Sequence, residues 1–205
     1  MEPQLSEIKE LRELTSAGIM DCKSALIEAN GDIEKAKAIL HEKGLASVAK
    51  KSSRATEEGL VASYIHSGGR IGSIIEVNCE TDFVAKTDDF INLNKDLAMH
   101  IAASAPISVK RENISLGVLE REKEIYADQA RQSGKPDNII EKMIEGRVNK
   151  FYQENVLLEQ AFVKDPDKTV QDIITDTIAK LGDNIVVSRF VRFQLGERTN
   201  NATDI

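Results

Sequence analysis

Residues 76–86 read EVNCETDFVAK, and they carry the chain from an apolar strand into a helix. At the turn between them a carboxylate, Asp82, stands beside a large aromatic side chain, Phe83. Asp favours turns and helix starts, whereas Phe favours burial. Two interpretations of Phe83 are therefore open. It is either an inward core residue, which its hydrophobicity favours, or an outward side chain that wedges into a partner.

Two β-prone segments around this stretch predict a hairpin. They are residues 60–65 and 71–79, and Ser67-Gly68-Gly69-Arg70 between them contains the glycine pair that a tight turn requires. No Gly-Lys-Ser or Gly-Lys-Thr follows the glycines, so the pattern does not favour a phosphate loop. His66 and Arg70 flank the turn, where they form either a solvated tip or a contact with a partner. One face of the second strand is expected to carry Ile71, Ile75, Val77 and Cys79.

A helix is predicted directly after the turn. Thr87 followed by two aspartates is typical of a helix N-terminus, because carboxylates are favoured at the positive end of the helix dipole. We expect the helix to end before Pro106 and to cover one face of the sheet. Its buried stripe should consist of Phe90, Leu93, Leu97 and Ile101.

The first part of the chain predicts a compact module of three short helices over residues 1–45, with the third helix stopped by Gly44. The pattern of helices is similar to ubiquitin-associated domains, and such small modules often expose an apolar patch for a partner. Residues 46–58 are small, polar and locally basic, so we interpret them as a partly helical linker. Its Lys50, Lys51 and Arg54 form either a solvated face or a contact with an acidic partner.

Residues 59–205 are predicted to form one further subdomain. Apolar residues at helical spacing on both sides of Gly134-Lys135-Pro136 indicate a helical hairpin at about 115–155, which is either a protruding arm or a dimer surface. A turn is expected at Pro166, and a helix from about Val170 should end at Gly182. The β-branched and aromatic run 185–195 is the natural third strand of the sheet. The fold class is therefore α+β, with a three-helix module followed by a small antiparallel three-stranded sheet packed with helices.

The charge and composition limit the possible functions. The 205 residues carry a formal net charge of -7, so a protein-wide electrostatic hold on nucleic acid is not expected. Aromatic residues make up only 4% of the chain, which does not favour a base-stacking platform. No basic-then-apolar leader and no long apolar run is present, so we expect a cytoplasmic protein without a membrane segment. The two cysteines lie in apolar patterns, which indicates buried thiols in a reducing compartment.

Residues able to perform bond chemistry are few. The three histidines have no Cys or carboxylate at ligand spacing, and no Ser-His or Cys-His pairing is visible, so we predict no metal, no cofactor and no enzyme activity. Cys79 stands beside Glu80 and close to Asp82, and this negative charge raises the pKa of a thiol instead of activating it. An enzyme that uses Cys79 as its nucleophile would therefore lack a base.

Two long motifs resemble signatures of the elongation factor Ts family. The first is Lys9-Glu10-Leu11-Arg12, Thr15 and the run from Ala17 to Leu26, and the second is the run from Glu76 to Ala85. Gly134-Lys135-Pro136, Glu141-Lys142-Met143 and Glu145-Gly146-Arg147 also resemble the helical hairpin of that family. The order and spacing of the motifs match over nearly the whole chain.

The resemblance implies a guanine-nucleotide exchange factor whose partner is the GTPase elongation factor Tu. In the family the N-terminal module contacts the GTPase, and positions matching Arg12, Met20 and Lys23 take part. The Thr-Asp-Phe-Val turn enters beside the nucleotide site and disturbs the magnesium and phosphate contacts. Here the turn consists of Thr81, Asp82, Phe83 and Val84.

Longer members of the family carry two copies of the central subdomain, whereas this chain carries one and resembles a short form. Its segment 64–72, which includes His66, Gly69 and Arg70, resembles the copy that contacts a distant domain of elongation factor Tu. This implies a homodimer in which one subunit offers the Phe83 turn and the other offers the His66–Arg70 tip. The buried thiols do not favour a disulfide-linked pair. The alternative of a ubiquitin-associated-like adaptor, with nucleic-acid contacts from the linker, leaves the Asp82-Phe83 turn unexplained.

Overall fold

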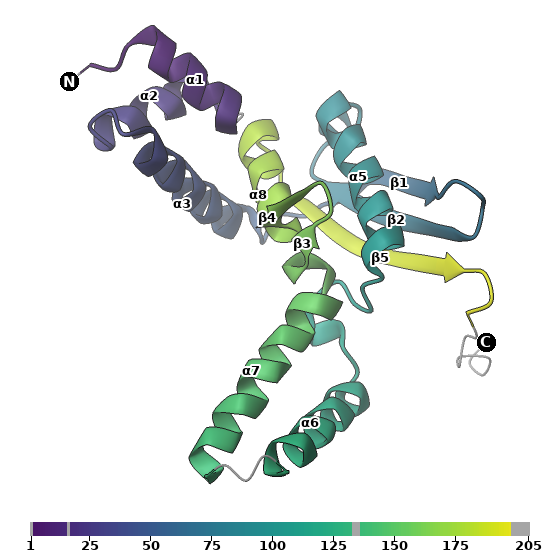
Figure 1. The fold of residues 1–205 in the computed structure, drawn as a ribbon. Helices are drawn as coiled ribbons and strands as arrows, with labels where there is room; N and C mark the ends of the chain where they lie inside the picture. The colour runs from purple at the N-terminus through teal and green to yellow at the C-terminus, as the bar shows by residue number, and fades with distance from the viewer. Residues whose placement is uncertain (1, 16, 133–135, 198–205) are drawn as a thin grey trace. The chain divides into compact units, whose positions relative to one another are not determined.

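The computed structural model of the protein describes residues 2–15, 17–132 and 136–197 (Figure 1). The chain forms two compact units, and each is built from three separate stretches of sequence. The first unit comprises Met1–Ala62, Glu76–Asp96 and Asp172–Ser188, and the second comprises Ser63–Ile75, Leu97–Gln171 and Arg189–Ile205. The predicted division into 1–45, 46–58 and 59–205 uses contiguous ranges of the chain, and it stays a prediction.

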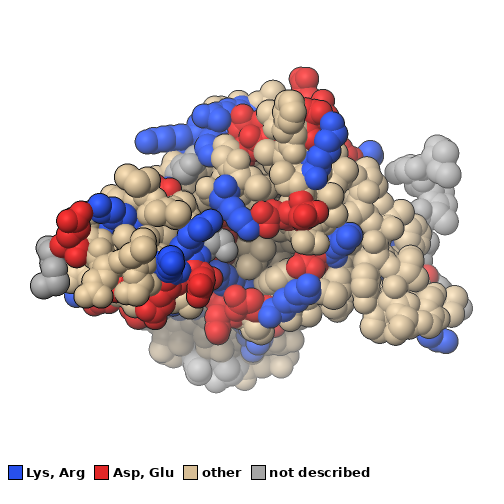
Figure 2. Space-filling model, turned by 90° about the horizontal axis from the view of Figure 1, so that it is seen from above, with Lys and Arg blue, Asp and Glu red and all other residues tan. Residues whose placement is uncertain are grey.

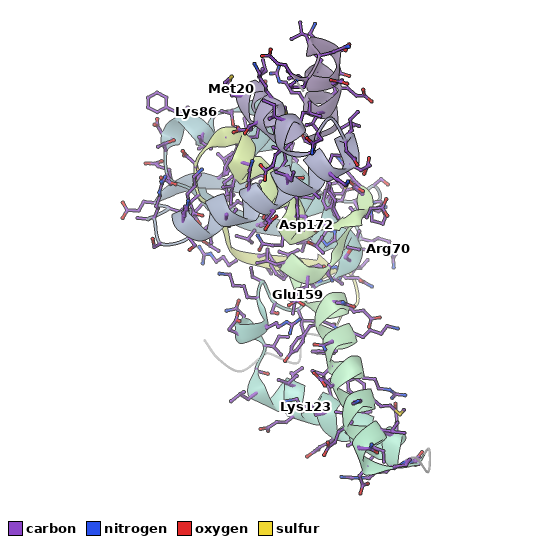
Figure 3. All side chains as sticks on the ribbon, turned by 90° about the vertical axis from the view of Figure 1, so that its left-hand side faces the viewer. Met20, Arg70, Lys86, Lys123, Glu159 and Asp172 are labelled. Carbon is purple, nitrogen blue, oxygen red and sulfur yellow. The ribbon has the colours of Figure 1, made fainter. Side chains whose placement is uncertain are left out.

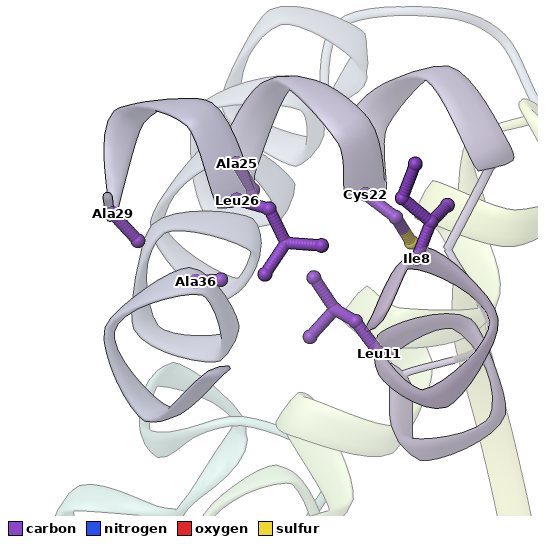
Figure 4. Close-up of a cluster of buried hydrophobic side chains, with 7 residues drawn as sticks. All are labelled: Ile8, Leu11, Cys22, Ala25, Leu26, Ala29 and Ala36. Carbon is purple, nitrogen blue, oxygen red and sulfur yellow. The ribbon is translucent and has the colours of Figure 1, made fainter. Parts of the chain in front are cut away.

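The three predicted N-terminal helices are present as α1 (Leu5–Thr15), α2 (Ile19–Glu28) and α3 (Ile33–Lys51). Asp32 caps α3, because its carboxylate accepts a hydrogen bond from the backbone N–H of Lys35 at 3.1 Å. Side chains from all three helices form one small core (Figure 4). It consists of Ile8, Leu11, Cys22, Ala25, Leu26, Ala29 and Ala36.

The predicted stop at Gly44 is wrong, since α3 continues through this glycine to Lys51. A glycine inside a helix costs about 1 kcal/mol relative to alanine, which lowers helix propensity but does not end a helix with favourable neighbours. Gly44 is buried, and a Cβ at this position would lie 3.5 Å from Cγ2 of Thr175 on α8 (Val170–Leu181). A Cβ here would therefore make an ordinary van der Waals contact with α8, so the space around the helix does not require glycine.

The three predicted strands form one antiparallel sheet in the order β1-β2-β5, with β1 (Glu58–Ile65), β2 (Ile71–Cys79) and β5 (Ile185–Gln194). At the predicted hairpin turn, Gly68 and Gly69 have φ of 91° and 67°, which is the left-handed region that glycine adopts freely. The face expected to be apolar is covered, since Ile75, Val77 and Cys79 are fully buried.

The predicted helix after the turn is α5 (Asp88–Ser104), and its expected stripe of Phe90, Leu93, Leu97 and Ile101 is buried. Within the second unit, Ser73 Oγ donates to the carbonyl of Ala98 at 2.5 Å, and Arg192 Nε donates to the carbonyl of Ala102 at 3.1 Å. These bonds attach β2 and β5 to α5, as expected for a helix that covers a sheet. The helix ends before Pro106, as predicted.

The predicted helical hairpin is present as α6 (Leu116–Arg131) and α7 (Asp137–Asn155), which contact each other. Pro136 is the residue before α7, whereas the predicted turn residues Gly134 and Lys135 lie outside the described residues. Where α6 and α7 meet, Arg147 lies over the ring of Tyr126, with 5.8 Å between the guanidinium carbon and the ring centre.

A small two-stranded sheet in the second unit was not expected from the sequence. It pairs β3 (Ala161–Phe162) with β4 (Asp165–Thr169) in antiparallel fashion, so Pro166 lies within a strand and the predicted turn at this residue is wrong. Proline is compatible with an edge strand, where its missing N–H faces away from the pairing. Two single-turn 3-10 helices complete the described elements, η1 (Arg111–Asn113) and η2 (Leu157–Glu159). Among the described helices, none combines the length and apolar character required to cross a membrane.

Candidate functional site

The turn after β2 presents an aromatic side chain on a fixed base. It is a short helix, α4 (Asp82–Ala85), and the hydroxyl of Thr81 accepts a hydrogen bond from the backbone N–H of Val84 at 3.4 Å. Val84 and Ala85 are buried, whereas Phe83 is 79% exposed. Phe83 therefore points outward, and the core interpretation that its hydrophobicity favoured is wrong, whereas its role as a wedge stays a prediction.

The charged groups of the turn are paired locally. Lys86 Nζ lies 2.6 Å from Asp82 Oδ2, four residues earlier on α4. This hydrogen bond lowers the pKa of the Asp82 carboxyl and raises the pKa of the Lys86 ammonium group. The Asp82 side chain is half exposed, so it remains available as a charged group beside Phe83.

Two carboxylates from different segments meet at the base of the turn. Asp183 Oδ2 accepts hydrogen bonds from the backbone N–H and the hydroxyl of Thr81, at 3.0 Å and 2.7 Å. Glu80 Oε1 accepts from the backbone N–H of Asn184 at 2.6 Å and pairs with Arg54 Nη1 at 3.3 Å. The bond from Asn184, with Arg54 adding to it, holds the pKa of the Glu80 carboxyl below its usual range.

The three N-terminal residues of the candidate site belong to the same unit as the turn. Met20 on α2 is 74% exposed, which is unusual for an apolar side chain of that size (Figure 3). Lys23 Nζ pairs with Glu2 at 3.0 Å. Arg12 is exposed on α1 and lines a surface hollow of about 470 Å³ with Lys9, Glu13 and Lys180.

The hairpin tip belongs to the second unit, so the structure does not assign it to the same unit as the Phe83 turn. His66, Gly69 and Arg70 are all exposed. The Tyr64 hydroxyl lies 3.1 Å from His66 Nδ1, which holds the imidazole against the strand. Arg70, labelled in Figure 3, is the residue directly before β2.

The side chains considered for catalysis or metal binding, such as Cys79, lie in surroundings that do not favour either role. Cys79 is buried, its thiol donates to the carbonyl of Thr81 at 3.2 Å, and burial raises the pKa of the thiol. A raised thiol pKa leaves little reactive thiolate at neutral pH. Among the described residues, no three His, Cys, Asp or Glu side chains are grouped so as to hold a metal ion. On the face seen in Figure 2, the described acidic and basic side chains are interspersed.

Sequence reasoning missed Asp183 and Asn184, which support the turn, and named Arg54 only as a linker residue without its partner Glu80. A weak signal was present, because Asp-Asn directly after the helix-stopping Gly182 is a typical loop pair. Nothing in that pattern indicates that its hydrogen-bond partner lies 102 residues earlier in the chain.

Comparison with known proteins gives one consistent result. Residues 5–197 match the family model described as Elongation factor TS. A protein named elongation factor Ts from Geotalea daltonii is 61% identical over 192 residues, covering 94% of this chain and 89% of that protein. Its namesakes from Thermoanaerobacter sp. (strain X514) and Fervidobacterium nodosum are 60% and 58% identical, covering 93% and 96% of this chain and 93% and 100% of those proteins. The chain therefore belongs to the elongation factor Ts family.

Proposed function

We propose that this chain is a guanine-nucleotide exchange factor for elongation factor Tu. It binds elongation factor Tu that carries GDP, promotes release of the GDP and so allows GTP to bind during translation elongation. The observation that carries the proposal, beside the family, is Phe83, an aromatic side chain that is 79% exposed although the next two residues, Val84 and Ala85, are buried. An exposed aromatic on a rigid base is suited to enter a pocket of another protein.

The exchange requires no bond chemistry and no cofactor of its own. Magnesium and a phosphate-binding loop supply much of a GTPase's hold on GDP, so disturbing either speeds release. In this proposal Thr81, Asp82, Phe83 and Val84 form the segment that disturbs these contacts. The coupling is reciprocal, because GDP must weaken binding of the factor as much as the factor weakens binding of GDP.

The remaining candidate residues supply affinity. Arg12, Met20 and Lys23 bind the GTPase from the N-terminal module, for which we keep the division into 1–45, the linker 46–58 and the subdomain 59–205. His66, Gly69 and Arg70 contact a second part of the same elongation factor Tu. The location is cytoplasmic, where translation elongation takes place, and neither nucleic acid nor a membrane takes part directly.

The factor acts as a homodimer in this proposal, so that one subunit offers the Phe83 turn and the other the His66–Arg70 tip. Support comes from exposed apolar residues on β1, β2 and the end of β5 in the second unit. Ile65, Ile74, Phe193 and Leu195 are exposed apolar residues there, and they line one hollow of about 430 Å³. An apolar surface of this kind is suited to bind its own copy.

Release of labelled GDP from elongation factor Tu tests the exchange function. The unsubstituted protein should speed release, and Phe83→Ala should reduce that gain at least about tenfold, because the aromatic contact is lost. Ile107→Ala is the matched control, since Ile107 is 53% exposed in the second unit and should leave release unchanged. A folded Phe83→Ala variant with full exchange would contradict the proposal.

Sedimentation of the free protein tests the dimer. The unsubstituted protein should sediment as a pair of chains, and Phe193→Glu should separate them, because a carboxylate is costly to bury in an apolar contact. A strictly monomeric protein with full exchange activity would overturn the homodimer while leaving the exchange function intact.

A further inference from the structure

In the loop between α8 and β5, the carboxylate of Asp183 binds the base of the Phe83 turn. Asp183 Oδ2 receives both the backbone N–H of Thr81, at 3.0 Å, and the Thr81 hydroxyl, at 2.7 Å. Hydrogen bonds to an ionised carboxylate are shorter and stronger than bonds between neutral groups. Two of them converge on the residue that immediately precedes α4.

The bond to Asp183 also determines what the Thr81 hydroxyl does next. A hydroxyl has one hydrogen to donate and lone pairs to accept with. Because its hydrogen points to Asp183, a lone pair faces the backbone N–H of Val84, 3.4 Å away, and caps α4. The carbonyl of Thr81 accepts from the Cys79 thiol and from the backbone N–H of Ala85, at 3.2 Å in each case. Every polar group of Thr81 therefore has a partner, and the direction of the turn is fixed.

A second set of bonds runs in the opposite direction between the same two segments. Glu80 Oε1 accepts from the backbone N–H of Asn184 at 2.6 Å. The Asn184 side chain, which is 3% exposed, donates to the carbonyl of Arg54 at 3.3 Å, and the Arg54 guanidinium returns to Glu80. Glu80-Thr81 and Asp183-Asn184 thus hold each other through reciprocal bonds, which we name the clasp.

We propose that Asp183 is a positioning residue for Phe83. Asp183 fixes the Thr81–Val84 turn, so that Phe83 keeps its place on binding and the contacts within the partner are the ones that shift. This inference rests on the proposed exchange function and deepens it. Phe83 has little packing of its own to hold it, since it is 79% exposed. The force that it exerts on a partner must therefore be borne by the backbone of the turn, and the clasp is what secures that backbone to a distant segment.

A positioning role predicts a specific division between rate and affinity. Without the clasp, the N-terminal module still offers Arg12, Met20 and Lys23, so the concentration of factor needed for half of the maximal effect should change less than about threefold. The maximal rate of GDP release should fall about tenfold, because the turn that carries Phe83 would then move when it meets the partner. A side chain that merely stabilises the fold would change the melting temperature and leave both kinetic quantities unaltered.

The first measurement is amide hydrogen exchange of Thr81 and Val84 in the full-length protein. Asp183→Ala should speed exchange of both amides about tenfold, since one loses its acceptor and the other loses its oriented cap. Asp89→Ala is the matched control, because Asp89 pairs with Lys180 at 2.7 Å in the same unit and carries the same charge. It should leave both amides protected. Unchanged protection in Asp183→Ala would overturn the clasp.

The second measurement is release of labelled GDP from elongation factor Tu by the same variants. Asp183→Asn keeps an oxygen acceptor and should recover part of the maximal rate that Asp183→Ala loses. Thr81→Val combined with Asp183→Ala should lose little more than either alone, because both remove one shared interaction. If Asp183→Ala does not fold, Asp183→Asn compared with Asp89→Asn decides the matter, since only the former should lower the maximal rate.

The outcomes separate the two proposals. Faster amide exchange with an unchanged maximal rate would overturn the positioning role and leave the exchange function standing. An unsubstituted protein that fails to speed GDP release would overturn the exchange function and the positioning role together, while the amide measurement would still decide whether the clasp holds the turn.

Discussion

The Phe83 turn and the His66–Arg70 tip are two exposed loops that are built in opposite ways. The turn is held by side chains, and its support comes from Asp183 and Asn184, which lie more than a hundred positions away in sequence. The tip is held mainly by backbone hydrogen bonds, including one from the N–H of Leu195 to the carbonyl of Arg70 at 2.8 Å. His66 N–H donates to the carbonyl of Ile71, and Gly69 N–H donates to the carbonyl of His66, both at 2.9 Å.

The contrast shows how a loop's construction sets what it tolerates. A loop supported by distant carboxylates tolerates changes of its exposed side chain but depends on the folding of another segment. A loop held mainly by its backbone, with glycines in the left-handed region, depends less on distant side chains, but a Cβ at those positions strains its backbone. We therefore expect the turn to depend on the side chains that support it, and the tip to depend on glycines that allow its backbone conformation.

The largest expected effect separates two phenylalanines close to the turn. Phe90 on α5 is fully buried, so Phe90→Ala should lower the free energy of unfolding by about 3–5 kcal/mol through loss of burial and the cavity left behind. Phe83→Ala should change it by less than about 0.5 kcal/mol, because the ring is exposed. Urea denaturation of both variants provides the measurement. A large loss of stability in Phe83→Ala would mean that the ring packs inward, and the comparison would fail.

A smaller effect is expected at the tip. Gly68→Ala and Gly69→Ala should each lower the free energy of unfolding by about 1–2 kcal/mol, because both glycines have φ in the left-handed region. The penalty is conformational, since a Cβ at either position would meet no atom within 4 Å. Thermal or urea unfolding measures it.

Gly146→Ala is the matched control for the tip. This glycine also has open space around its Cβ position, but it lies inside α7 with an ordinary helical φ. Replacing it should raise the free energy of unfolding by about 0.5–1 kcal/mol, because alanine favours the helix. If the substitutions at the tip were stabilising as well, the tip would not owe its shape to glycine.

The same contrast explains which features could be predicted from the sequence. Strand β2 was predicted at residues 71–79 and the helical hairpin at about 115–155, where they are observed, because helical and strand periodicities are local patterns. The stop expected at Gly44 failed because a single glycine costs a helix only about 1 kcal/mol, which favourable neighbours on both sides outweigh. The short pairing of β3 with β4 was missed, since a strand of two residues has no periodicity to recognise.

The candidate site divides along the same line. The motif that contains Thr81 to Val84 could be located from its resemblance to a family, but the direction of Phe83 could not be derived from spacing. The short helix α4 has four residues, which is too few for a periodic pattern to define a buried face. The role of Asp183 in supporting the turn could not be predicted, because it arises only when two segments far apart in sequence meet.

The smallest expected effect concerns how stability depends on pH through the buried His100 of the second unit. His100 on α5 is fully buried and stacks on Phe162, with 5.8 Å between the ring centres. Its Nδ1 accepts from the backbone N–H of Val163 at 3.2 Å, so the ring is neutral and its Nε2 carries the hydrogen that Gln160 Oε1 accepts at 2.9 Å. Val163 in turn lines a hollow with Tyr64 and His66 at the end of β1.

Burial lowers the pKa of His100 below the ordinary value of 6.5, and the bond to Gln160 opposes this shift. Between these two pKa values the unfolded chain binds the proton and the folded chain does not, so stability falls as the pH falls through about 6.5 and levels off below the folded pKa. From about pH 7 to about pH 6 the loss should stay under about 1 kcal/mol. Urea denaturation at constant ionic strength measures it. His100→Gln should flatten the profile, whereas His66→Gln at the exposed tip should keep it. A profile unchanged in His100→Gln would show that the buried imidazole does not control it.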